Sequence, residues 1–344
     1  MYQWLRNGLF LLPPETAHDL ALNALSAGRF VGLPRLMGSC DESRPVELMG
    51  LTFPNPVGLA AGLDKNGDHI DALGELGFGF IEVGTVTPKP QPGNPKPRLF
   101  RLPEHQALIN RLGFNNKGVD HLVARLRTRR FKGIVGANIG KQKATPVDRA
   151  AEDYRHCLEK VYPHCDYIAV NISSPNTANL RELQDTGHLR ELLVELTRAH
   201  ASLAAEHGLS RPLLVKIAPD WEEEALTASL NVVGESGIDG LLATNTTLER
   251  TAVNGHRHAN EVGGLSGAPL KPQADRVLRH ARRVLGKDFP IIGLGGIMQG
   301  TDAAEKQDAG ADLVQIYTGF IYRGPALIRE CIRAWNGDGS ASGT

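Results

Sequence analysis

The sequence predicts an α/β fold, a closed (β/α)8 TIM-type barrel preceded by an amphipathic helical hairpin. Eight short apolar runs typical of strands follow one another, helix-like stretches separate most of them, and each run ends in polar or glycine residues. Alternating strands and helices imply a parallel sheet, and eight repeats favour closure. An open dinucleotide-binding sheet would carry a GxGxxG turn after its first strand, and Gly58–Gly62 lacks that spacing.

The chain of 344 residues is long enough for one barrel with an extra segment. Its 38 basic residues equal its 38 acidic ones, so charge gives no argument for a nucleic-acid partner. The histidines form no HExxH arrangement, and we predict no metal site. Widely spaced cysteines without a CxxC pair indicate reduced thiols in a cytosolic setting. These cysteines are Cys40, Cys157, Cys165 and Cys331.

Residues 1–38 read as two short amphipathic helices broken at Pro13-Pro14. The segment lacks the basic start and continuous apolar stretch of a secretory signal, and no run approaches the ~18 apolar residues of a membrane span. Two interpretations stay open. The helices pack on the barrel as a hairpin, or they lie in a membrane interface with Trp4 and Leu9–Leu12 entering the lipid.

A β-hairpin is expected over residues 45–54, with its turn at Gly50. The eight barrel strands are then predicted at Val57–Gly62, Phe80–Val86, Ile134–Ile139, Tyr167–Ile172, Leu213–Ile217, Gly240–Ala243, Ile291–Leu294 and Leu313–Ile316. The intervening helices are predicted at Asp68–Leu76, Val119–Arg127, Ala150–Val161, Leu189–Ala205, Glu222–Ser236, Ala274–Leu285 and Thr301–Ala309.

The carboxyl ends of barrel strands line the active site, and here they carry amides, hydroxyls, glycines and two lysines. No carboxylate pair suggests a glycosidase, and no His/Asp/Glu cluster suggests a metal hydrolase. The richest stretch is Asn171–Thr177, which offers two amides and three hydroxyls directly after a buried strand. The strand ends read Asp64-Lys65, Thr85, Asn138, Asn171 with Ser174, Lys216, Thr244–Thr246, Gly295-Gly296 and Tyr317-Thr318.

Glycines after the last two strands favour a phosphate site, which barrels often place there. A further cluster, Gly263–Gly267, lies in the long loop after strand six. The ligand would be a phosphorylated substrate or a phosphate-bearing cofactor such as FMN. Lys216 is either a cation beside a flavin or the Schiff-base lysine of a barrel aldolase.

Several long motifs resemble those of the class 2, quinone-dependent dihydroorotate dehydrogenases, along nearly the whole chain. The motifs lie at Gly58–Lys65, Glu82–Pro88, Pro97–Leu102, Ile109–Asn115, Asn171–Thr177, Ala243–Thr247, Gly263–Gly267 and Val314–Gly319. The resemblance implies oxidation of dihydroorotate to orotate in pyrimidine synthesis, with FMN as electron carrier and a membrane quinone as acceptor.

The resemblance also implies roles for individual residues. FMN would contact Ala61, Gly62, Leu63, Asp64, Lys65, Thr85, Asn138, Asn171, Lys216, Thr244, Gly267, Gly296, Tyr317 and Thr318. The substrate would contact Lys65, Asn110, Arg111, Leu112, Gly113, Phe114, Asn171, Asn176, Asn245 and Thr246. Asparagine suits a neutral cyclic imide, because its amide offers both a donor and an acceptor.

Ser174 would be the catalytic base, taking a proton from C5 of dihydroorotate while a hydride leaves C6. Serine is a weak base, so we expect a proton relay through Thr177 and a water near Phe114. The quinone would enter between the N-terminal helices and meet His18, Arg101 and Tyr317. Class 1 relatives carry cysteine at the position of Ser174 and lack these helices.

The expected organisation is a membrane and quinone-access segment at 1–38, an FMN-binding barrel at 39–336 and a tail at 337–344. The resemblance places the protein peripherally on the cytoplasmic face of the cell membrane. We expect a monomer that binds no nucleic acid. Two rival hypotheses are a non-redox aldolase or isomerase that works through Lys216, and a membrane-attached scaffold with an inactive barrel.

Overall fold

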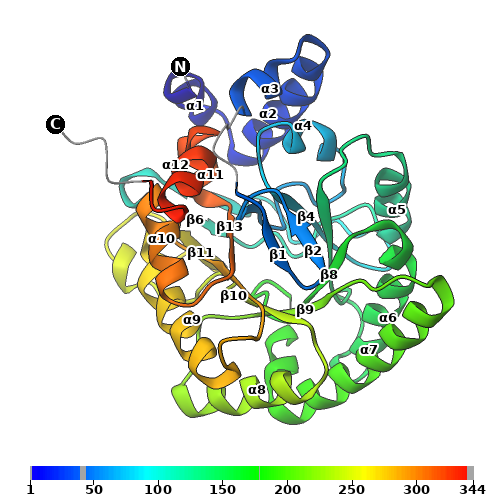
Figure 1. Ribbon diagram of the computed structural model, residues 1–344. Helices are drawn as coiled ribbons and strands as arrows, with labels where there is room; N and C mark the ends of the chain where they lie inside the picture. The colour runs from blue at the N-terminus through cyan, green and yellow to red at the C-terminus, as the bar shows by residue number, and fades with distance from the viewer. Residues whose placement is uncertain (1, 39–43, 178, 339–344) are drawn as a thin grey trace.

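A computed structural model of the protein describes residues 2–38, 44–177 and 179–338. Eight parallel strands form a closed barrel, in which each strand pairs with the next along the chain and the last pairs with the first (Figure 1). The predicted barrel is therefore confirmed. Its strands are β3 (Val57–Leu59), β4 (Phe80–Val86), β7 (Ile134–Ile139), β8 (Tyr167–Asn171), β9 (Leu213–Ile217), β10 (Gly240–Ala243), β12 (Ile291–Leu294) and β13 (Leu313–Ile316).

The helices surround this barrel, and all seven that were predicted between strands are present, six of them with shifted ends. The N-terminal break at Pro13 is confirmed, but a third short helix follows the expected pair. The bounds are α1 (Tyr2–Phe10), α2 (Pro14–Gly28), α3 (Leu33–Gly38), α4 (Ile70–Gly74), α5 (Val119–Thr128), α6 (Ala150–Val161), α7 (Thr186–His207), α8 (Glu223–Glu235), α9 (Lys271–Leu285), α10 (Gly300–Asp308), α11 (Thr318–Arg323) and α12 (Ala326–Trp335).

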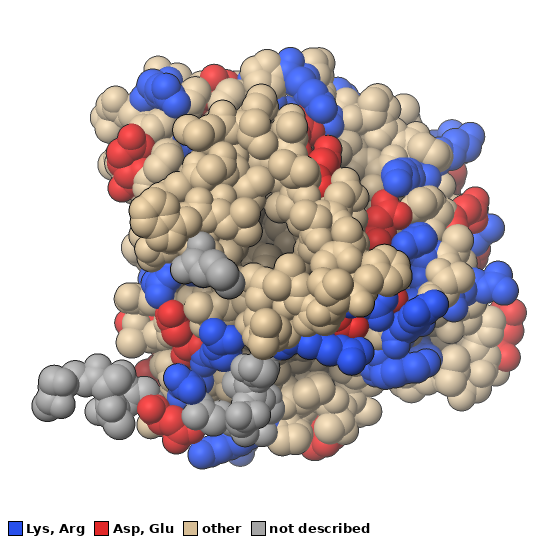
Figure 2. Space-filling model, turned by 90° about the horizontal axis from the view of Figure 1, so that it is seen from above, with Lys and Arg blue, Asp and Glu red and all other residues tan. Residues whose placement is uncertain are grey.

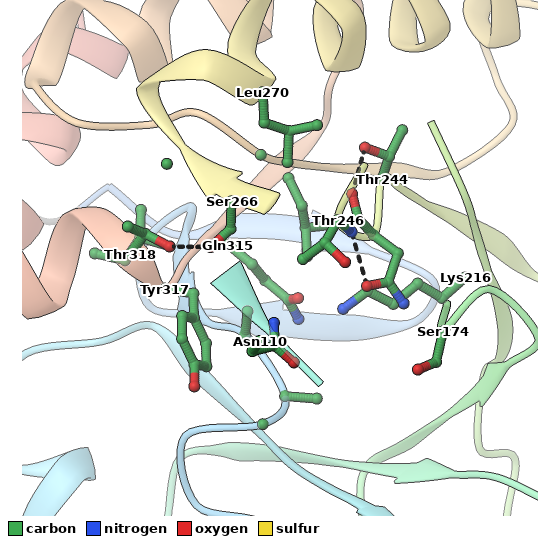
Figure 3. A pocket seen from close by; sticks show the side chains of 18 of the residues that line it. Asn110, Ser174, Lys216, Thr244, Thr246, Ser266, Leu270, Gln315, Tyr317 and Thr318 are labelled. Atoms are coloured by element: carbon green, nitrogen blue, oxygen red, sulfur yellow. Dashed lines mark hydrogen bonds between the residues drawn. The ribbon is translucent and has the colours of Figure 1, made fainter. Parts of the chain in front are cut away.

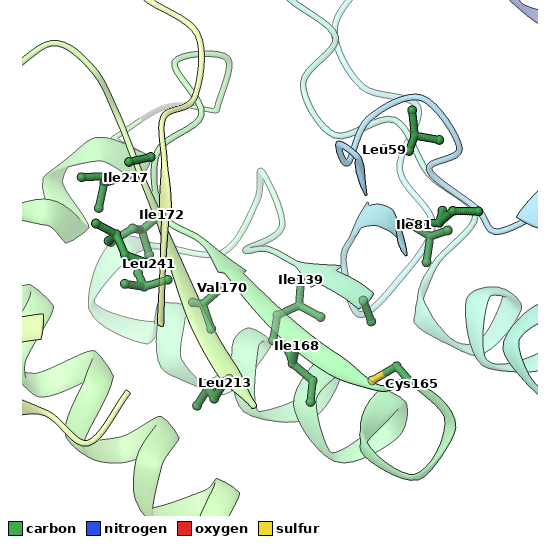
Figure 4. Packing of buried hydrophobic residues seen from close by; sticks show 14 of the residues in the cluster. Leu59, Ile81, Ile139, Cys165, Ile168, Val170, Ile172, Leu213, Ile217 and Leu241 are labelled. Atoms are coloured by element: carbon green, nitrogen blue, oxygen red, sulfur yellow. The ribbon is translucent and has the colours of Figure 1, made fainter. Parts of the chain in front are cut away.

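Side chains of the barrel strands alternate between the helices outside and the interior, as the two-residue period of a strand requires. Figure 4 shows the outward set, in which Ile168, Val170 and Leu213 pack in the layer between strands and helices. These residues are fully buried. Both faces of the strands are thus covered, which explains why the strands read as continuous apolar runs.

A short antiparallel hairpin, β1 (Val46–Leu48) and β2 (Leu51–Phe53), closes the barrel at the amino ends of the strands. Its Phe53 is fully buried, and its ring lies 5.1 Å from that of Phe80, measured between centroids. Glycines make room for the aromatic interior, because a Cβ on Gly58 would stand 2.3 Å from the Phe80 ring. The predicted hairpin is confirmed, and it fills the lower half of the barrel.

A three-stranded antiparallel sheet, which the sequence analysis did not predict, covers the opposite end of the barrel. It consists of β5 (Leu99–Leu102), β6 (Ala107–Asn110) and β11 (Gly264–Gly267), with β6 in the centre. Residues 263–267, which we expected within a long loop, therefore form mainly a strand. Their glycines permit close approach, since a Cβ on Gly264 would stand 1.9 Å from the hydroxyl of Thr246.

The N-terminal helices are attached to the barrel by buried and charged contacts. Leu22 of α2 is buried, and Arg29 forms ion pairs with Asp71 at 2.9 Å and Glu75 at 2.8 Å. Glu15 pairs with Arg98 at 2.9 Å. In the described parts of the chain, none of the helices has the length and apolar character needed to cross a membrane.

Replacing Phe53 with alanine should destabilise the barrel, because it leaves a cavity where the hairpin fills the interior. We expect a loss of about 3–5 kcal/mol of unfolding free energy, measured by urea denaturation. The matched control is Phe30→Ala, because this side chain is 94% exposed. Equal stability of the Phe53→Ala variant and the wild-type protein would contradict the assigned role of the hairpin.

Candidate active site

A deep cavity lies at the carboxyl ends of the barrel strands, beneath the β5–β6–β11 sheet. With its mouth, it holds ≈ 990 Å³ free of protein atoms. Its lining comes from both layers, so that Ser174 and Lys216 from the barrel and Asn110 from β6 share one space (Figure 3). All but one of the eight predicted strand ends contribute to this lining.

Ser174 is buried and borders the cavity, and its Oγ accepts a hydrogen bond from the backbone of Asn176 at 3.3 Å. Four asparagines border the same space: Asn110, Asn171, Asn176 and Asn245. The amide of Asn176 donates to Asn110 at 3.1 Å. The site therefore combines one buried hydroxyl with several amides, and no carboxylate borders it among the described residues.

Lys216 is a buried cation that borders the cavity, and within the described chain its Nζ forms no hydrogen bond or ion pair. Burial lowers the pKa of this lysine, while the nearby Glu82 acts in the opposite direction. An unpaired buried ammonium is costly unless a ligand supplies its partner. The donor set therefore fits an anionic or electron-rich ligand.

Backbone N–H groups provide a second binding feature. Gly295, Gly296 and Thr318 border the cavity, and in the described ranges none of their backbone N–H groups donates to a protein acceptor. The hydroxyl groups of Thr318 and Ser266 lie 2.8 Å apart beside them. Free N–H groups at a glycine-rich turn suit a phosphate, so the residues present fit a phosphate-bearing cofactor.

Lys65 is the second lysine of the cavity. Burial, and to a smaller extent the charge of Arg98, lowers the pKa of Lys65 to about 8. Glu15, Asp19 and Asp64 oppose that shift. Lys65 is therefore protonated at neutral pH and close to its titration point.

A buried hydrogen-bond network beneath the cavity was missed by the sequence analysis. Glu82 is fully buried inside the barrel, where its carboxylate accepts hydrogen bonds from Asn138 at 2.8 Å, Tyr167 at 3.0 Å and Gln315 at 2.8 Å. The signal was present in the sequence, because a glutamate within the apolar run Phe80–Val83 must find partners if it is buried.

A second cavity lies between α2 and the barrel, and it shares Lys65, Leu112 and Tyr317 with the first. His18 borders this second cavity. Burial, followed by the charge of Lys65, lowers the pKa of His18 to about 4, so the imidazole is neutral at pH 7. The two cavities thus meet at a common wall.

Some predicted site residues lie outside the central cavity. Leu63 and Asp64 face the second cavity, because the Asp64 carboxylate accepts from the backbone N–H groups of Asp68 and His69. Leu63 and Asp64 therefore do not line the central cavity, and their contact with the cofactor stays a prediction. The predicted residues that border neither cavity are Arg101, Arg111, Asn138 and Thr177.

Each of these four residues has an identifiable reason for its position. Arg111 pairs with Glu261 at 2.6 Å, so its guanidinium is directed away from the cavity. Arg101 bonds to the carbonyls of Leu9 and Leu12 and thereby fastens the turn between α1 and α2.

Asn138 and Thr177 lie behind the cavity wall, where both are buried. Asn138 bonds to Thr85, Asn171 and Glu82, so it supports residues that do reach the cavity. The hydroxyl of Thr177 has no hydrogen-bond partner in the described ranges. Phe114, its predicted companion in the relay, does border the cavity.

The described thiols agree with the prediction of reduced cysteines. Cys157, Cys165 and Cys331 are buried and free. Cys40 lies outside the described residues. Across the described ranges, no group of histidine, cysteine or acidic residues has the arrangement of a metal site.

Residues 44–336 match the family model of dihydroorotate dehydrogenase. A protein from Marinobacter nauticus called dihydroorotate dehydrogenase (quinone) is 56% identical over 334 residues, which cover 97% of this chain and 98% of that protein. A protein of the same name from Azotobacter vinelandii is 55% identical over 334 residues, which cover 97% of this chain and 96% of that protein. The ligand-free dihydroorotate dehydrogenase structure from Eimeria tenella aligns with a TM-score of 0.86 at 39% identity, covering 95% of this chain and 96% of that one. The chain therefore belongs to the dihydroorotate dehydrogenase family, in its quinone-dependent class.

Proposed function

We propose that this protein oxidises dihydroorotate to orotate in pyrimidine biosynthesis and passes the electrons through FMN to a membrane quinone. The observation that carries the proposal is the combination of Ser174 with four asparagines and Lys65 in one buried cavity. A hydroxyl base and neutral amides suit a substrate that is a cyclic imide bearing one carboxylate. The family to which the chain belongs supports the same reaction.

Lys65 would bind the substrate carboxylate, and the asparagine amides would bind the imide edge. The hydroxyl oxygen of Ser174 would take the proton from C5, which leaves the C5–C6 bond to become a double bond as a hydride departs from C6. Phe114 and Leu112 border this space and would limit the entry of water. We keep Thr177 as the proposed next member of the proton path, because its buried hydroxyl has no hydrogen-bond partner among the described residues.

FMN would be held by the backbone N–H groups of Gly295, Gly296 and Thr318 at its phosphate, with Ala61, Gly62, Thr85, Thr244 and Gly267 along the remaining lining. When bound, FMN supplies the two-electron acceptor for the hydride. Lys216 would place its charge beside the ring system, where a cation favours a reduced, anionic carrier. We infer an indirect role for Asn138, through its hydrogen bonds to Thr85 and Asn171.

The quinone would approach through the N-terminal segment and meet His18 and Tyr317. Support comes from the second cavity, which ends at the wall that Tyr317 shares with the first. A neutral imidazole at His18 suits an uncharged quinone head better than a cation would. Arg101 would act by holding the turn between α1 and α2.

We propose that the protein binds peripherally to the cytoplasmic face of the membrane through residues 1–38. The face that carries α1 to α3 is hollowed near its centre, and uncharged residues form most of the rim (Figure 2). Large apolar side chains are exposed on this segment, and such a patch is typical of a membrane or protein contact. They are Trp4, Leu5, Leu11, Leu20, Phe30, Val31, Leu33 and Leu36.

Ser174→Ala should reduce the rate of flavin bleaching by dihydroorotate about 10²–10⁴-fold at neutral pH, because the base that accepts the C5 proton is lost. Bound FMN should remain at one equivalent per chain. Anaerobic stopped-flow absorbance measures the rate, and Ser202→Ala on the exposed side of α7 is the control. A variant rate within threefold of wild type would exclude Ser174 as the base. A colourless, fully active wild-type protein would exclude FMN.

Orotate binding should weaken as the pH rises through about 8. Lys65 binds the carboxylate only while it is protonated, so the attraction is complete below that pKa and is lost above it. Titration calorimetry at pH values on both sides of 8 should show this loss of orotate affinity in the wild-type protein and not in Lys65→Met. An identical pH dependence in both proteins would show that another group is responsible.

Phe30→Ser combined with Leu36→Ser should weaken co-sedimentation with phosphatidylethanolamine and phosphatidylglycerol vesicles at least about tenfold. Each exposed side chain would otherwise contribute roughly 1.5–3 kcal/mol on entering lipid. The matched control is Val194→Ser on α7, which is 48% exposed. Flavin bleaching by dihydroorotate should be unchanged in both variants. Vesicle binding equal to wild type would contradict membrane attachment through this surface.

A further inference from the structure

A directed chain of hydrogen bonds runs from the cavity down to Glu82. Asn171 donates through Nδ2 to Thr85 Oγ1 at 2.9 Å, and Thr85 donates to Asn138 Oδ1 at 2.5 Å. Asn138 in turn donates through Nδ2 to Glu82 Oε1 at 2.8 Å. Every donor in this chain points toward the carboxylate. The members come from three adjacent strands, β4, β7 and β8.

Both ends of the chain have a fixed polarity. An ionised carboxylate can only accept hydrogen bonds, so Glu82 obliges Asn138 to present its NH₂ group downward and its oxygen upward. At the other end, the backbone N–H of Ser173 donates to Asn171 Oδ1 at 3.3 Å. A backbone N–H can only donate, so the oxygen of Asn171 must face Ser173. The orientation of each amide is therefore determined by its neighbours.

This polarity reaches the residues that border the cavity. Asn171 and Thr85 line it directly, whereas Asn138 and Glu82 lie behind them. Asn245, which also lines the cavity, donates to Asn171 Oδ1 at 3.4 Å and to Ser173 Oγ at 3.0 Å. A reversal anywhere in the chain would change which donors and acceptors meet a ligand.

We propose that Glu82 is a positioning residue, whose carboxylate sets the donor and acceptor pattern that Thr85 and Asn171 present to the ligands of the cavity. Glu82 does not border the cavity, and it acts on Thr85 and Asn171 through Asn138. The choice of orotate as ligand rests on the function proposed above. The other carboxylate oxygen accepts from Tyr167 and from Gln315, whose side chain also borders the cavity.

An exchange of two residues tests this proposal. In Glu82→Gln, the oxygen of the new amide satisfies Tyr167 and Gln315, which leaves its NH₂ group facing the NH₂ group of Asn138. Either those two donors remain opposed, or Asn138 turns over and the Thr85 proton is driven out toward the cavity. Both outcomes alter the polar lining.

Adding Asn138→Asp to that variant restores the pattern. The new carboxylate accepts from the new amide below it and from Thr85 and Asn171 above it. The number of negative charges in the barrel is the same as in wild type. The double variant therefore repairs both polarity and charge.

Titration calorimetry of the FMN-loaded proteins should show orotate affinity at least about tenfold lower in Glu82→Gln, as expected for an unsatisfied buried donor. The double variant should recover most of that loss. The matched control is Tyr167→Phe, which removes a bond to the other carboxylate oxygen and should change orotate affinity less than threefold. Glu82→Gln binding orotate as tightly as wild type would overturn the proposal, and so would a double variant no better than Glu82→Gln.

Thermal unfolding provides a readout that requires no ligand. It can still be measured if one of the single-substitution variants is too unstable for calorimetry. The double variant should unfold at a higher midpoint than Glu82→Gln and than Asn138→Asp, and a lower midpoint than both would overturn the proposal. If the wild-type protein fails to bind orotate, the proposed function is wrong, while the comparison of midpoints still decides the role of Glu82.

Discussion

The closure of β13 onto β3 is the constraint on which the rest of the structure depends. A closed ring of strands directs every second side chain into an interior too narrow for solvent, and that interior must be filled from one end to the other. Phe53 and Phe80 fill the lower part with aromatic rings. Lys216 and Asn171, which are paired in register on adjacent strands, occupy the upper part. The active cavity lies where the apolar filling stops.

Local sequence patterns predicted the features that depend on one strand or one helix alone, namely its position and its buried face. The strands and their polar ends were legible because burial on both faces requires apolar runs and because the runs stop where side chains meet a ligand. The resemblance of long motifs to the dihydroorotate dehydrogenases then implied roles for individual residues, which the spacing of residues alone did not specify. Asn171 and Ser174 border the cavity, while the roles that the resemblance implies for them stay predictions.

Pairing between distant segments could not be predicted. The sheet above the cavity joins β6 to β11, and more than one hundred and fifty positions separate Leu108 from its partner Ser266. Side-chain direction was equally hidden: Arg111 sits in a motif beside the substrate residues, yet Glu261 draws its guanidinium outward. The pairing of β6 with β11 and the direction of the Arg111 side chain both depend on tertiary contacts, which composition and periodicity do not encode.

The wall shared by the two cavities has a consequence for kinetics. Tyr317, Lys65 and Leu112 line both cavities, so a substrate and a quinone bound as proposed above would not compete for the same volume. Under that proposal, product could leave one cavity while the other is still occupied. Inhibitors directed at the two sides should therefore combine without excluding each other, and resistance substitutions that arise against one class should leave the other effective unless they alter the wall itself.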